Sequence, residues 1–301
     1  MGNVIDSYAC SVTFPIKICF TTIVADDGKI IPRHATIFPT NICNLNCSFC
    51  SHSECDRESS IDFQHLKEMV KEGKYFGFRA ITLSGGGEPL LYNSIEDLIW
   101  FIHRQGIEIG LITNGTLLNR IPKTLLNKLT WCRISMSDNR DILNDNIVDI
   151  IRNTDITWGC NYILTENFNR QLLLALLKQA AQLDFEYFRI TDDQHNDNIE
   201  LPNIKLPEFA YYFRRNDYME PGGACYIGLL KPTINVDGLI YPCCHPTTMK
   251  RLDSKNAIAV SIQELYDKQP VFDGSICLKC PFMQYNRILG KLKSITHSAF
   301  L

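Results

Sequence analysis

The feature that most constrains the fold is an alternation of short apolar runs with longer helical patterns, which begins near residue 35. The apolar runs are rich in β-branched residues and predict six strands, at 35–39, 80–84, 108–113, 131–136, 157–164 and 187–191. Apolar residues at helical spacing predict five helices between them, at 62–72, 94–104, 123–129, 142–152 and 170–183. Strands that alternate with helices pair in parallel. The sequence therefore predicts an α/β sheet that curves into a full or partial barrel, with ligands at the carboxyl ends of its strands.

The regions on either side of this pattern differ from it. Residues 1–34 alternate in polarity and then turn at Asp26-Asp27-Gly28-Lys29, which predicts an N-terminal β-hairpin extension. Residues 192–207 are polar and carry prolines, so we expect a loop there. Beyond it, residues 201–301 combine short strands and turns with too few regularly spaced apolar residues for a large core. We therefore expect the barrel to span 35–200 and a small, metal-stapled subdomain to span 201–301.

The composition argues against several classes of protein. The 301 residues are 45% hydrophobic and 21% charged, which is typical of a folded globular chain. The formal net charge of −3 provides no overall attraction for nucleic acid or anionic lipid, so we do not expect nucleic acid as a partner. No run of about 18 apolar residues is present, and the first residues lack a basic start before an apolar core. We therefore expect a cytoplasmic protein with no membrane partner.

Thirteen cysteines are the most distinctive feature of the composition, and three of them form a tight group. An odd number of cysteines in a cytosolic chain favours metal binding or redox chemistry over disulfides. Cys43, Cys47 and Cys50 follow the first predicted strand directly. Structural zinc sites close with four protein ligands, whereas three cysteines suit a cubane iron–sulfur cluster with one iron left for an outside ligand. The alternative, buried apolar cysteine, requires no fixed spacing.

With the aromatic Phe49 before the third cysteine, this group resembles the signature of the radical S-adenosylmethionine (SAM) enzymes. The resemblance implies a partial (β/α)6 TIM-like barrel with a [4Fe-4S] cluster on the three cysteines. In that family the open iron binds the amino and carboxylate groups of SAM. An electron from the reduced cluster cleaves SAM, and the resulting 5′-deoxyadenosyl radical removes a hydrogen atom from the substrate. The resemblance also implies an electron donor of the flavodoxin or ferredoxin type.

A glycine-rich segment extends the resemblance. Gly85, Gly86, Gly87 and Glu88 directly follow the second predicted strand. They resemble the family's glycine–glycine–glutamate segment, which holds the methionine amino group of SAM. Glycine allows close approach of the backbone to a ligand and tolerates positive φ, and both properties would explain the cluster.

Polar residues at the ends of later predicted strands agree with the resemblance to radical SAM enzymes. Asn114 follows the third predicted strand, Ser135 ends the fourth and Arg189 lies in the sixth. The resemblance implies contacts from such positions to the ribose and carboxylate of SAM. Helix capping and turn chemistry are the alternatives for each residue.

Four further cysteines come from two distant segments of the C-terminal part, and they are Cys225, Cys243, Cys277 and Cys280. Four thiols can close a zinc site or bind an iron–sulfur cluster fully, and spacing alone does not decide between them. The arrangement is similar to the SPASM extension of radical SAM enzymes in its shortened form, called twitch, which implies a second, auxiliary [4Fe-4S] cluster. The adjacent Cys244 could replace a ligand, pack inertly or act catalytically by donating a hydrogen atom.

Acidic residues near the sixth strand bear on the substrate. Six acids lie between residues 184 and 200, against the single base Arg189. An acidic mouth would favour cationic substrates such as amino sugars or Lys- and Arg-containing peptides. The alternative is an ordinary solvated loop.

The resemblance leaves several reactions open. Relatives with such extensions oxidise or epimerise small polar, amino-sugar-like or peptide substrates, and others modify ribosomally made peptides, for instance by forming cross-links. Candidate hydrogen-atom donors are the thiols of Cys55, Cys132, Cys160 and Cys244. We therefore expect an oxidoreductase or epimerase. The alternatives are a peptide cross-linking enzyme and a non-catalytic scaffold that binds zinc or an iron–sulfur cluster.

Overall fold

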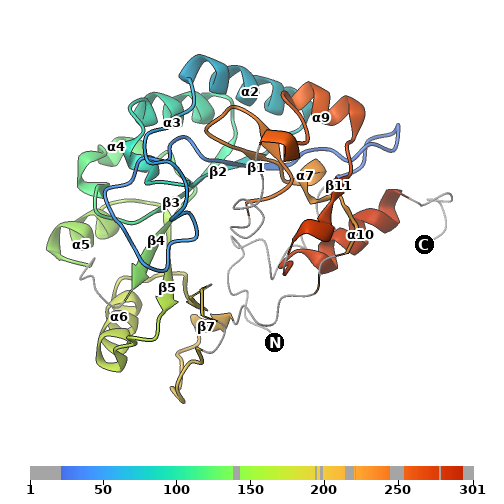
Figure 1. Cartoon of the computed structure of the whole chain (residues 1–301). Coiled ribbons are helices and arrows are strands. Elements are labelled where there is room, and N and C mark those ends of the chain that lie inside the picture. Colours follow the sequence, from blue (N-terminus) through green and yellow to red (C-terminus); the bar gives the residue numbers. More distant parts are fainter. Residues whose placement is uncertain are drawn as a thin grey trace.

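The computed structural model describes residues 22–137, 143–193, 195–196, 199–213, 220, 222–244, 254–277 and 279–293. Its centre is a strongly curved sheet with helices on the outer side (Figure 1). The sheet is parallel over most of its width, as expected when strands alternate with helices.

The six predicted strands are all present, and they pair in parallel in the order of the chain. They are β1 (His34–Ile37), β2 (Ala80–Leu83), β3 (Glu108–Thr113), β4 (Trp131–Ser137), β5 (Thr157–Leu164) and β6 (Tyr187–Asp192). Each observed end lies within two residues of its prediction. The predicted α/β partial barrel is thus confirmed.

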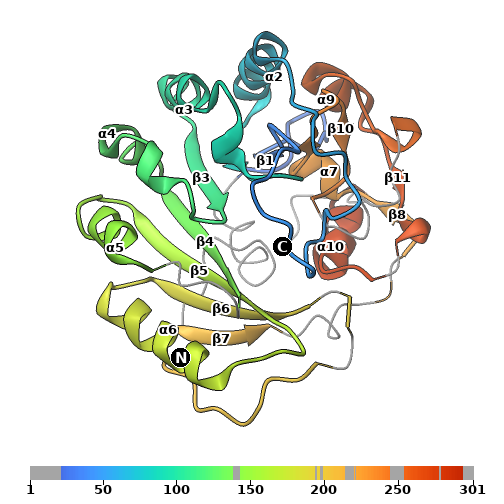
Figure 2. The ribbon, with the colours of Figure 1, turned by 60° about the vertical axis from the view of Figure 1, so that its left-hand side comes forward.

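The five predicted helices are also present, and they cover the outer face of the sheet (Figure 2). They are α2 (Phe63–Phe76), α3 (Ile95–Arg104), α4 (Lys123–Leu126), α5 (Asp145–Arg152) and α6 (Arg170–Gln182). Side chains cap three of their N-termini, because Asp62, Asn144 and Asn169 each accept a hydrogen bond from a backbone N–H of the first turn. Helix α2 runs four residues beyond its prediction and ends at Gly77, whose φ of 132° is unfavourable for other residues.

The sheet continues past the predicted strands at both edges. Strand β7 (Ala210–Phe213) pairs with β6 in parallel. At the other edge, β9 (Thr233–Ile234) pairs in parallel with β1, and β10 (Ile240–Tyr241) pairs antiparallel with β9. Short strands were expected in residues 201–301, but their positions were not predicted, since two to four residues are too few to show a clear period. The C-terminal part of the chain therefore shares one sheet with the barrel.

Further helices and strands complete the C-terminal part, and one of them, α9, packs against α2. They are β8 (Ala224–Cys225), α7 (Ile227–Leu230), α9 (Ile262–Lys268), β11 (Phe272–Asp273) and α10 (Met283–Lys293). The Glu72 carboxylate accepts hydrogen bonds from the first backbone N–H groups of α9, at 3.0 Å for Ile262. The rings of Phe76 and Tyr266 stack with centroids 4.9 Å apart. Figure 1 shows α9 next to α2 at the rim of the barrel.

The described residues include the turn of the predicted N-terminal hairpin. Val24 and Ile30 form an antiparallel bridge around the turn, in which Gly28 has a φ of 79°. The side-chain amide of Gln269, just after α9, binds both the N–H and the carbonyl of Ile30, at 2.8 and 3.0 Å. Most of the first arm of the predicted hairpin falls in residues 1–21, outside the described part of the chain.

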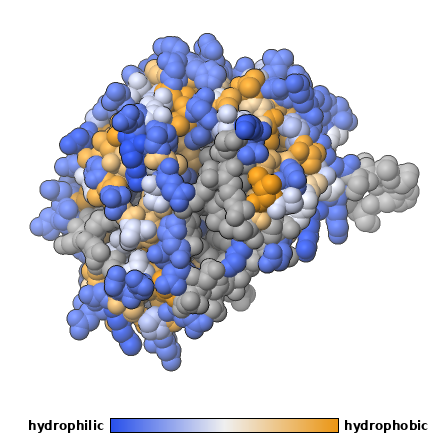
Figure 3. Space-filling view, in the orientation of Figure 1, coloured by the Kyte–Doolittle hydropathy of each residue, from blue (hydrophilic) through white to orange (hydrophobic). Residues whose placement is uncertain are grey.

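The apolar core lies between the sheet and the helices, where the outward-facing strand residues meet the inner faces of α2, α3, α5 and α6. Hydrophilic residues dominate much of the face drawn in Figure 3, with apolar ones interspersed. Among the helices of the described residues, none is long and apolar enough to cross a lipid bilayer.

Candidate active site

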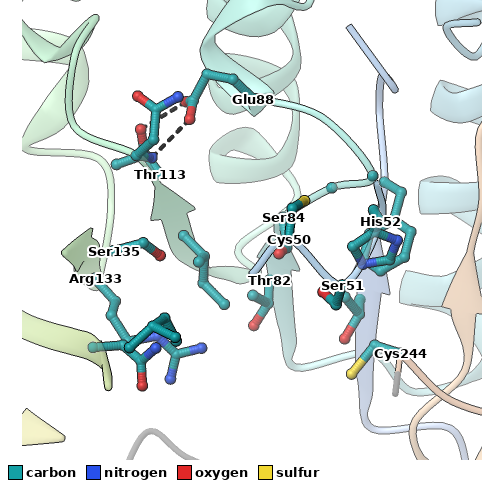
Figure 4. A pocket seen from close by; sticks show the side chains of 18 of the residues that line it. Cys50, Ser51, His52, Thr82, Ser84, Glu88, Thr113, Arg133, Ser135 and Cys244 are labelled. Atoms are coloured by element: carbon teal, nitrogen blue, oxygen red, sulfur yellow. Dashed lines mark hydrogen bonds between the residues drawn. The ribbon is translucent and has the colours of Figure 1, made fainter. Parts of the chain in front are cut away.

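A cavity of about 380 Å³ opens inside the barrel, and it gathers most of the predicted site residues (Figure 4). The lining residues that the sequence had pointed to are Cys43, Cys47, Phe49, Cys50, Gly85, Gly86, Gly87, Glu88, Asn114, Ser135, Arg189 and Cys244. The parallel strands bring these side chains together because their carboxyl ends share one edge of the sheet.

The cysteine loop leaves β1 and is closed at its base by hydrogen bonds. The Thr40 hydroxyl lies 2.7 Å from the Ser60 hydroxyl, and the Asn41 N–H donates to the Ser59 carbonyl at 2.8 Å. Within the loop, the Cys50 N–H donates to the Cys47 carbonyl at 3.0 Å. A loop closed at its base in this way can present three thiols from a fixed backbone.

Asp56 is the main electrostatic contributor to this closure. Its carboxylate accepts hydrogen bonds from the Asn41 side-chain amide at 2.9 Å and from the backbone N–H groups of Glu58 and Ser59 at 3.1 and 2.7 Å. Partial burial acts to raise the pKa of Asp56, but hydrogen bonds from Ser59, Asn41 and Glu58 outweigh it and lower the pKa to about 2. The loop base therefore contains a carboxylate that stays ionised.

The glycine segment packs directly against the backbone that leads into the cysteine loop. The Gly87 N–H donates to the Thr40 carbonyl at 3.0 Å, and the Glu88 N–H donates to the Ile42 carbonyl at 2.8 Å. A Cβ on Gly87 would lie 2.1 Å from the Ile42 oxygen, and one on Gly86 would lie 2.1 Å from the Asn41 side-chain oxygen. Glycine is therefore needed here for close approach of two chain segments.

Positive φ, which the sequence analysis offered as a second reason for these glycines, is not found. None of Gly85, Gly86 and Gly87 has a positive φ, so that part of the prediction is wrong. The left-handed conformation occurs instead at Gly115, with a φ of 81°, in the turn that follows β3. Steric contact with the cysteine loop, and not backbone conformation, explains the cluster.

Glu88 is buried, with 2% of its surface exposed, and its carboxylate links the glycine segment to the end of β3. It accepts hydrogen bonds from the Thr113 hydroxyl at 2.6 Å and from the Asn114 N–H at 2.7 Å, which Figure 4 shows as dashed lines. It also accepts from the Leu90 N–H at 3.1 Å. Glu88 thus lines the cavity and also fixes the relative position of two strand ends.

Two other predicted residues have partners within the site. The Asn114 side-chain amide donates to the Asn44 side-chain oxygen at 3.0 Å, which ties the end of β3 to the cysteine loop. The Arg189 Nε donates to the Asn161 side-chain oxygen at 2.7 Å, between β6 and β5. Both residues therefore help to hold the wall of the cavity while they face its interior.

The three loop thiols suit a cubane better than a single metal ion. None of the eleven cysteines in the described residues forms a disulfide, and Cys43, Cys47 and Cys50 are half-buried at the cavity. Over the described residues, no three Cys, His, Asp or Glu side chains converge closely enough to bind one ion. Tetrahedral zinc draws all its ligands to one centre, whereas each cysteine of a cubane binds a different iron, so the sulfurs stay farther apart. The donor set thus fits a cubane with an open iron.

The other candidate thiols separate into two groups. Cys132 and Cys160 are fully buried on the helix side of β4 and β5, where burial raises their pKa values well above the ordinary range. Cys55 is half-buried beside His52, outside the cavity lining, and burial raises its pKa as well. The expectation that these three could donate hydrogen atoms in the cavity is wrong. Cys244 does line the cavity (Figure 4).

The C-terminal cysteines gather beside α10. Burial raises the pKa of Cys225 to about 12, although the backbone N–H of Ile227 acts to lower it. The charges of Cys280 and Cys277 raise this pKa further, so the three thiols lie close enough to interact electrostatically. A Cβ on Gly228 would lie 2.8 Å from the Cα of Pro242, so the segment before Cys243 packs against α7, two residues after Cys225. Four soft thiolate donors from converging segments are compatible with an iron–sulfur cluster.

Asn286 holds the backbone on both sides of Cys225 in place. This residue of α10 is buried, with 5% of its surface exposed. Its side-chain oxygen accepts from the Tyr226 N–H at 2.6 Å, and its amide donates to the Ala224 carbonyl at 2.6 Å. Asn286 was not predicted from the sequence, since a single Asn in an amphipathic helix carries no distinguishing signal.

The described acids near β6 do not form the cavity wall. Asp184 and Glu186 precede β6, so they lie at the amino ends of the strands, and the cysteine loop lies at the carboxyl ends. None of the described acids between 184 and 200 lines the cavity. Asp197 lies outside the described residues. Asp192 is buried and accepts a hydrogen bond from the Tyr212 hydroxyl. The expected acidic lining is therefore absent from this part of the site, so it gives no support for a cationic substrate.

Comparisons with known proteins agree with this geometry. Residues 37–165, which hold the cysteine loop, the glycine segment and strands β2 to β5, match the family model described as the Radical SAM superfamily. This part of the chain thus matches a radical SAM domain, the kind of domain whose cofactors are SAM and a [4Fe-4S] cluster.

Individual relatives resemble parts of the chain. A probable GTP 3′,8-cyclase from Sulfolobus acidocaldarius is 33% identical over 180 residues, which cover 58% of this chain and 57% of that protein. The chain spans between 28% and 60% of the length of the first curated relatives it matches.

Solved structures share the fold at low identity. Streptococcus suis SuiB bound to precursor peptide SuiA has a TM-score of 0.57 at 15% identity, and the match covers 72% of this chain and 60% of SuiB. Histidine-tagged anSMEcpe with bound AdoMet has a TM-score of 0.56 at 16% identity, covering 88% and 86% of the two chains. These likenesses extend the shared fold beyond the family model into the C-terminal part.

Proposed function

We propose that this protein binds a [4Fe-4S] cluster on Cys43, Cys47 and Cys50, cleaves SAM reductively and abstracts a hydrogen atom from a carbon of its substrate. One observation carries the proposal: the three thiols and the glycine segment share one cavity, and the backbone N–H groups of Gly87 and Glu88 donate hydrogen bonds to the carbonyls of Thr40 and Ile42, which joins the two segments. When bound, the reduced cluster supplies the electron that produces the 5′-deoxyadenosyl radical. The chain itself positions both cofactors and excludes water.

The surrounding residues have separate tasks in this proposal. Glu88 offers a carboxylate for the methionine amino group of SAM, and its hydrogen bonds from Thr113 and Asn114 keep it in place. Asn114 and Ser135 offer polar groups for the ribose, and Arg189 offers a cation for the carboxylate. Phe49 offers an apolar ring at the same wall.

The C-terminal cysteines are proposed to hold an auxiliary [4Fe-4S] cluster in a SPASM/twitch-like region over residues 201–301. The gathering of Cys225, Cys277 and Cys280 supports this assignment, as does the contact of the Pro242 segment with α7. An auxiliary cluster at this place offers an acceptor for the second electron of an oxidation. A flavodoxin- or ferredoxin-type protein is the proposed donor of the first electron.

For the overall reaction we infer oxidation or epimerisation of a small polar or peptide substrate. Cys244 supports epimerisation, because among the described lining residues it is the thiol outside the cluster loop, and it could return a hydrogen atom to the substrate. Peptide cross-linking is one alternative, since SuiB binds a precursor peptide, and nucleotide cyclisation is the one suggested by the name of the GTP 3′,8-cyclases. Reaction in deuterium oxide separates the first two: solvent deuterium fixed at one carbon indicates epimerisation, and loss of two hydrogens indicates oxidation.

The test of the central proposal is formation of 5′-deoxyadenosine. Protein reconstituted with iron and sulfide without oxygen is incubated with SAM and dithionite. Wild type is expected to release 5′-deoxyadenosine, Cys43→Ala to release none, and Cys277→Ala to retain the cleavage with a lower iron content. A non-catalytic zinc or cluster scaffold would release none from any variant. Equal loss of cleavage in the two folded variants would contradict the separate roles of the two cysteine groups.

A further inference from the structure

We infer that the inner part of the cavity binds an anionic group, a carboxylate or a phosphate, on the substrate, through Arg133 and Lys231. This inference rests on the proposed function only in treating the ligand as the substrate of the radical reaction. The observations concern residues that the cofactor assignment does not use.

Charge is the first observation. The charged side chains in the described lining are Arg133, Arg189 and Lys231 on one side and Glu88 on the other. Glu88 already accepts hydrogen bonds from Thr113, Asn114 and Leu90. A wall with three cations and one internally bonded carboxylate attracts anions, especially where burial weakens solvent screening.

Depth is the second observation. Arg133 precedes Ser135 by two residues on β4, so it faces the same side of the sheet but lies farther from the carboxyl edge. Figure 4 shows Arg133 and Cys244 at the end of the cavity away from Glu88. Lys231 precedes β9 and has 9% of its surface exposed. These two cations therefore lie beyond the residues proposed for SAM.

The construction of the floor is the third observation. The Trp131 ring lies against Gly110 of β3, where a Cβ would stand 2.2 Å from the ring, and the Arg133 guanidinium lies 5.9 Å from the Trp131 centroid. The Lys231 ammonium lies 5.9 Å from the ring centroid of Phe282, which also lines the cavity. Aromatic rings thus support both cations and limit their motion, which favours binding of a small anion in one orientation.

We assign Arg133 to an anionic group of the substrate and not to the carboxylate of SAM. SAM carries a single carboxylate, which is already assigned to Arg189, in register with Ser135 across β5. Arg133 can bind a carboxylate or phosphate with two parallel hydrogen bonds, and Lys231 can add a point charge. The substrate class is therefore an organic acid or a phosphorylated compound, a peptide with an acidic side chain included.

The test compares probes of opposite charge on the reconstituted holoenzyme. Glutarate and 1,5-diaminopentane have five carbons each, and glycerol 3-phosphate separates phosphate from carboxylate recognition. Glutarate or glycerol 3-phosphate is expected to raise the thermal unfolding midpoint of the wild type, and the diamine is not. Arg133→Gln and Lys231→Gln are expected to weaken anion binding about tenfold each, as for loss of one charged hydrogen bond. Arg133→Lys should retain part of the binding.

Arg104→Gln is the matched control, since Arg104 also lies over a tryptophan, 5.8 Å from the ring centroid of Trp100, but on the surface. It should bind anions as the wild type does. Preference for the diamine, binding of neither anion, or equal effects of Arg104→Gln and Arg133→Gln would overturn the inference. Tenfold weaker SAM binding in Arg133→Gln would assign Arg133 to the cofactor and would also overturn it. Anion binding without 5′-deoxyadenosine formation would leave the anion site intact and refute the proposed function instead.

Discussion

Replacement of Gly87 by alanine should separate the glycine segment from the cysteine loop. The new Cβ would stand 2.1 Å from the Ile42 oxygen and 2.4 Å from the Asn41 carbonyl carbon. Both are backbone atoms, so no side-chain rotation relieves the contact. Ordinary van der Waals separation requires one segment to retreat by about 1 Å or more. Overpacking of this kind costs about 1–3 kcal/mol.

The retreat has two measurable consequences. It lengthens the hydrogen bond from the Glu88 N–H to the Ile42 carbonyl, now 2.8 Å, next to Cys43. We therefore expect Gly87→Ala to lower the free energy of unfolding in urea by about 1–3 kcal/mol and to bind less iron after reconstitution. Gly223→Ala is the control, because a Cβ at Gly223 meets nothing within 4 Å and its φ is not positive. Wild-type stability and iron content in Gly87→Ala would refute the steric explanation of the glycine cluster.

Other changes test separate parts of the account. Cys132→Ala and Cys160→Ala should retain both 5′-deoxyadenosine formation and substrate turnover, because both thiols are buried away from the cavity; loss of turnover in a folded variant that still forms 5′-deoxyadenosine would return them to the list of hydrogen-atom donors. Asp56→Asn should lower stability at neutral pH by roughly 1 kcal/mol after screening of this exposed group. The pKa of Asp56 in the folded protein is lowered from 3.8 to about 2, so its contribution to stability is present above pH 4 and is lost as the pH falls toward 2. Urea unfolding of the wild type and Asp56→Asn should therefore show a difference in stability that shrinks over this pH range. A constant difference would contradict the charge argument. Asn286→Leu removes both hydrogen bonds that flank Cys225 and should lower the free energy of unfolding in urea by about 1–3 kcal/mol. The variant should also bind less iron after reconstitution. An unchanged iron content would show that Asn286 does not support the C-terminal cysteines.

The barrel could be predicted from sequence because its signals are local and repeated. Each strand from β1 to β6 is a run of apolar and β-branched residues, and each from β1 to β5 is followed by a helix with an apolar face. Strands β9 and β10 have two residues each; β9 joins the sheet by pairing with β1, a contact over nearly two hundred residues of chain, and β10 joins it by pairing with β9. Such pairing leaves no periodic pattern in a two-residue segment.

The parts of the candidate site that depend on the spacing of residues along the chain could be predicted from the sequence. The parts that depend on the direction of side chains were not predicted. The spacing of Cys43, Cys47 and Cys50 was sufficient to place them at the carboxyl edge of β1. The alternation of side chains along β4 could also have shown that Cys132 faces away from Ser135 and that Arg133 faces with it. Asn286 and Asp56 act through bonds to backbone atoms, for which the sequence offers no distinctive pattern.

Reasoning from charge along the chain gave the weakest prediction. Asp184 and Glu186 are close in sequence to the mouth residues, but they lie at the opposite end of β6. A strand of six residues spans about 20 Å, so residues at its two ends belong to different surfaces. Local charge density is informative only after the strand direction is included.

The most direct measurement for the central claim is electron paramagnetic resonance of the Cys225→Ala/Cys277→Ala protein, reconstituted with iron and sulfide without oxygen and then reduced. Removing two C-terminal thiols leaves the cluster on the β1 loop as the expected source of signal. We predict a [4Fe-4S] spectrum that changes when SAM is added, because SAM occupies the open iron. A folded protein that shows no such cluster, or one whose spectrum is identical with and without SAM, would contradict the account.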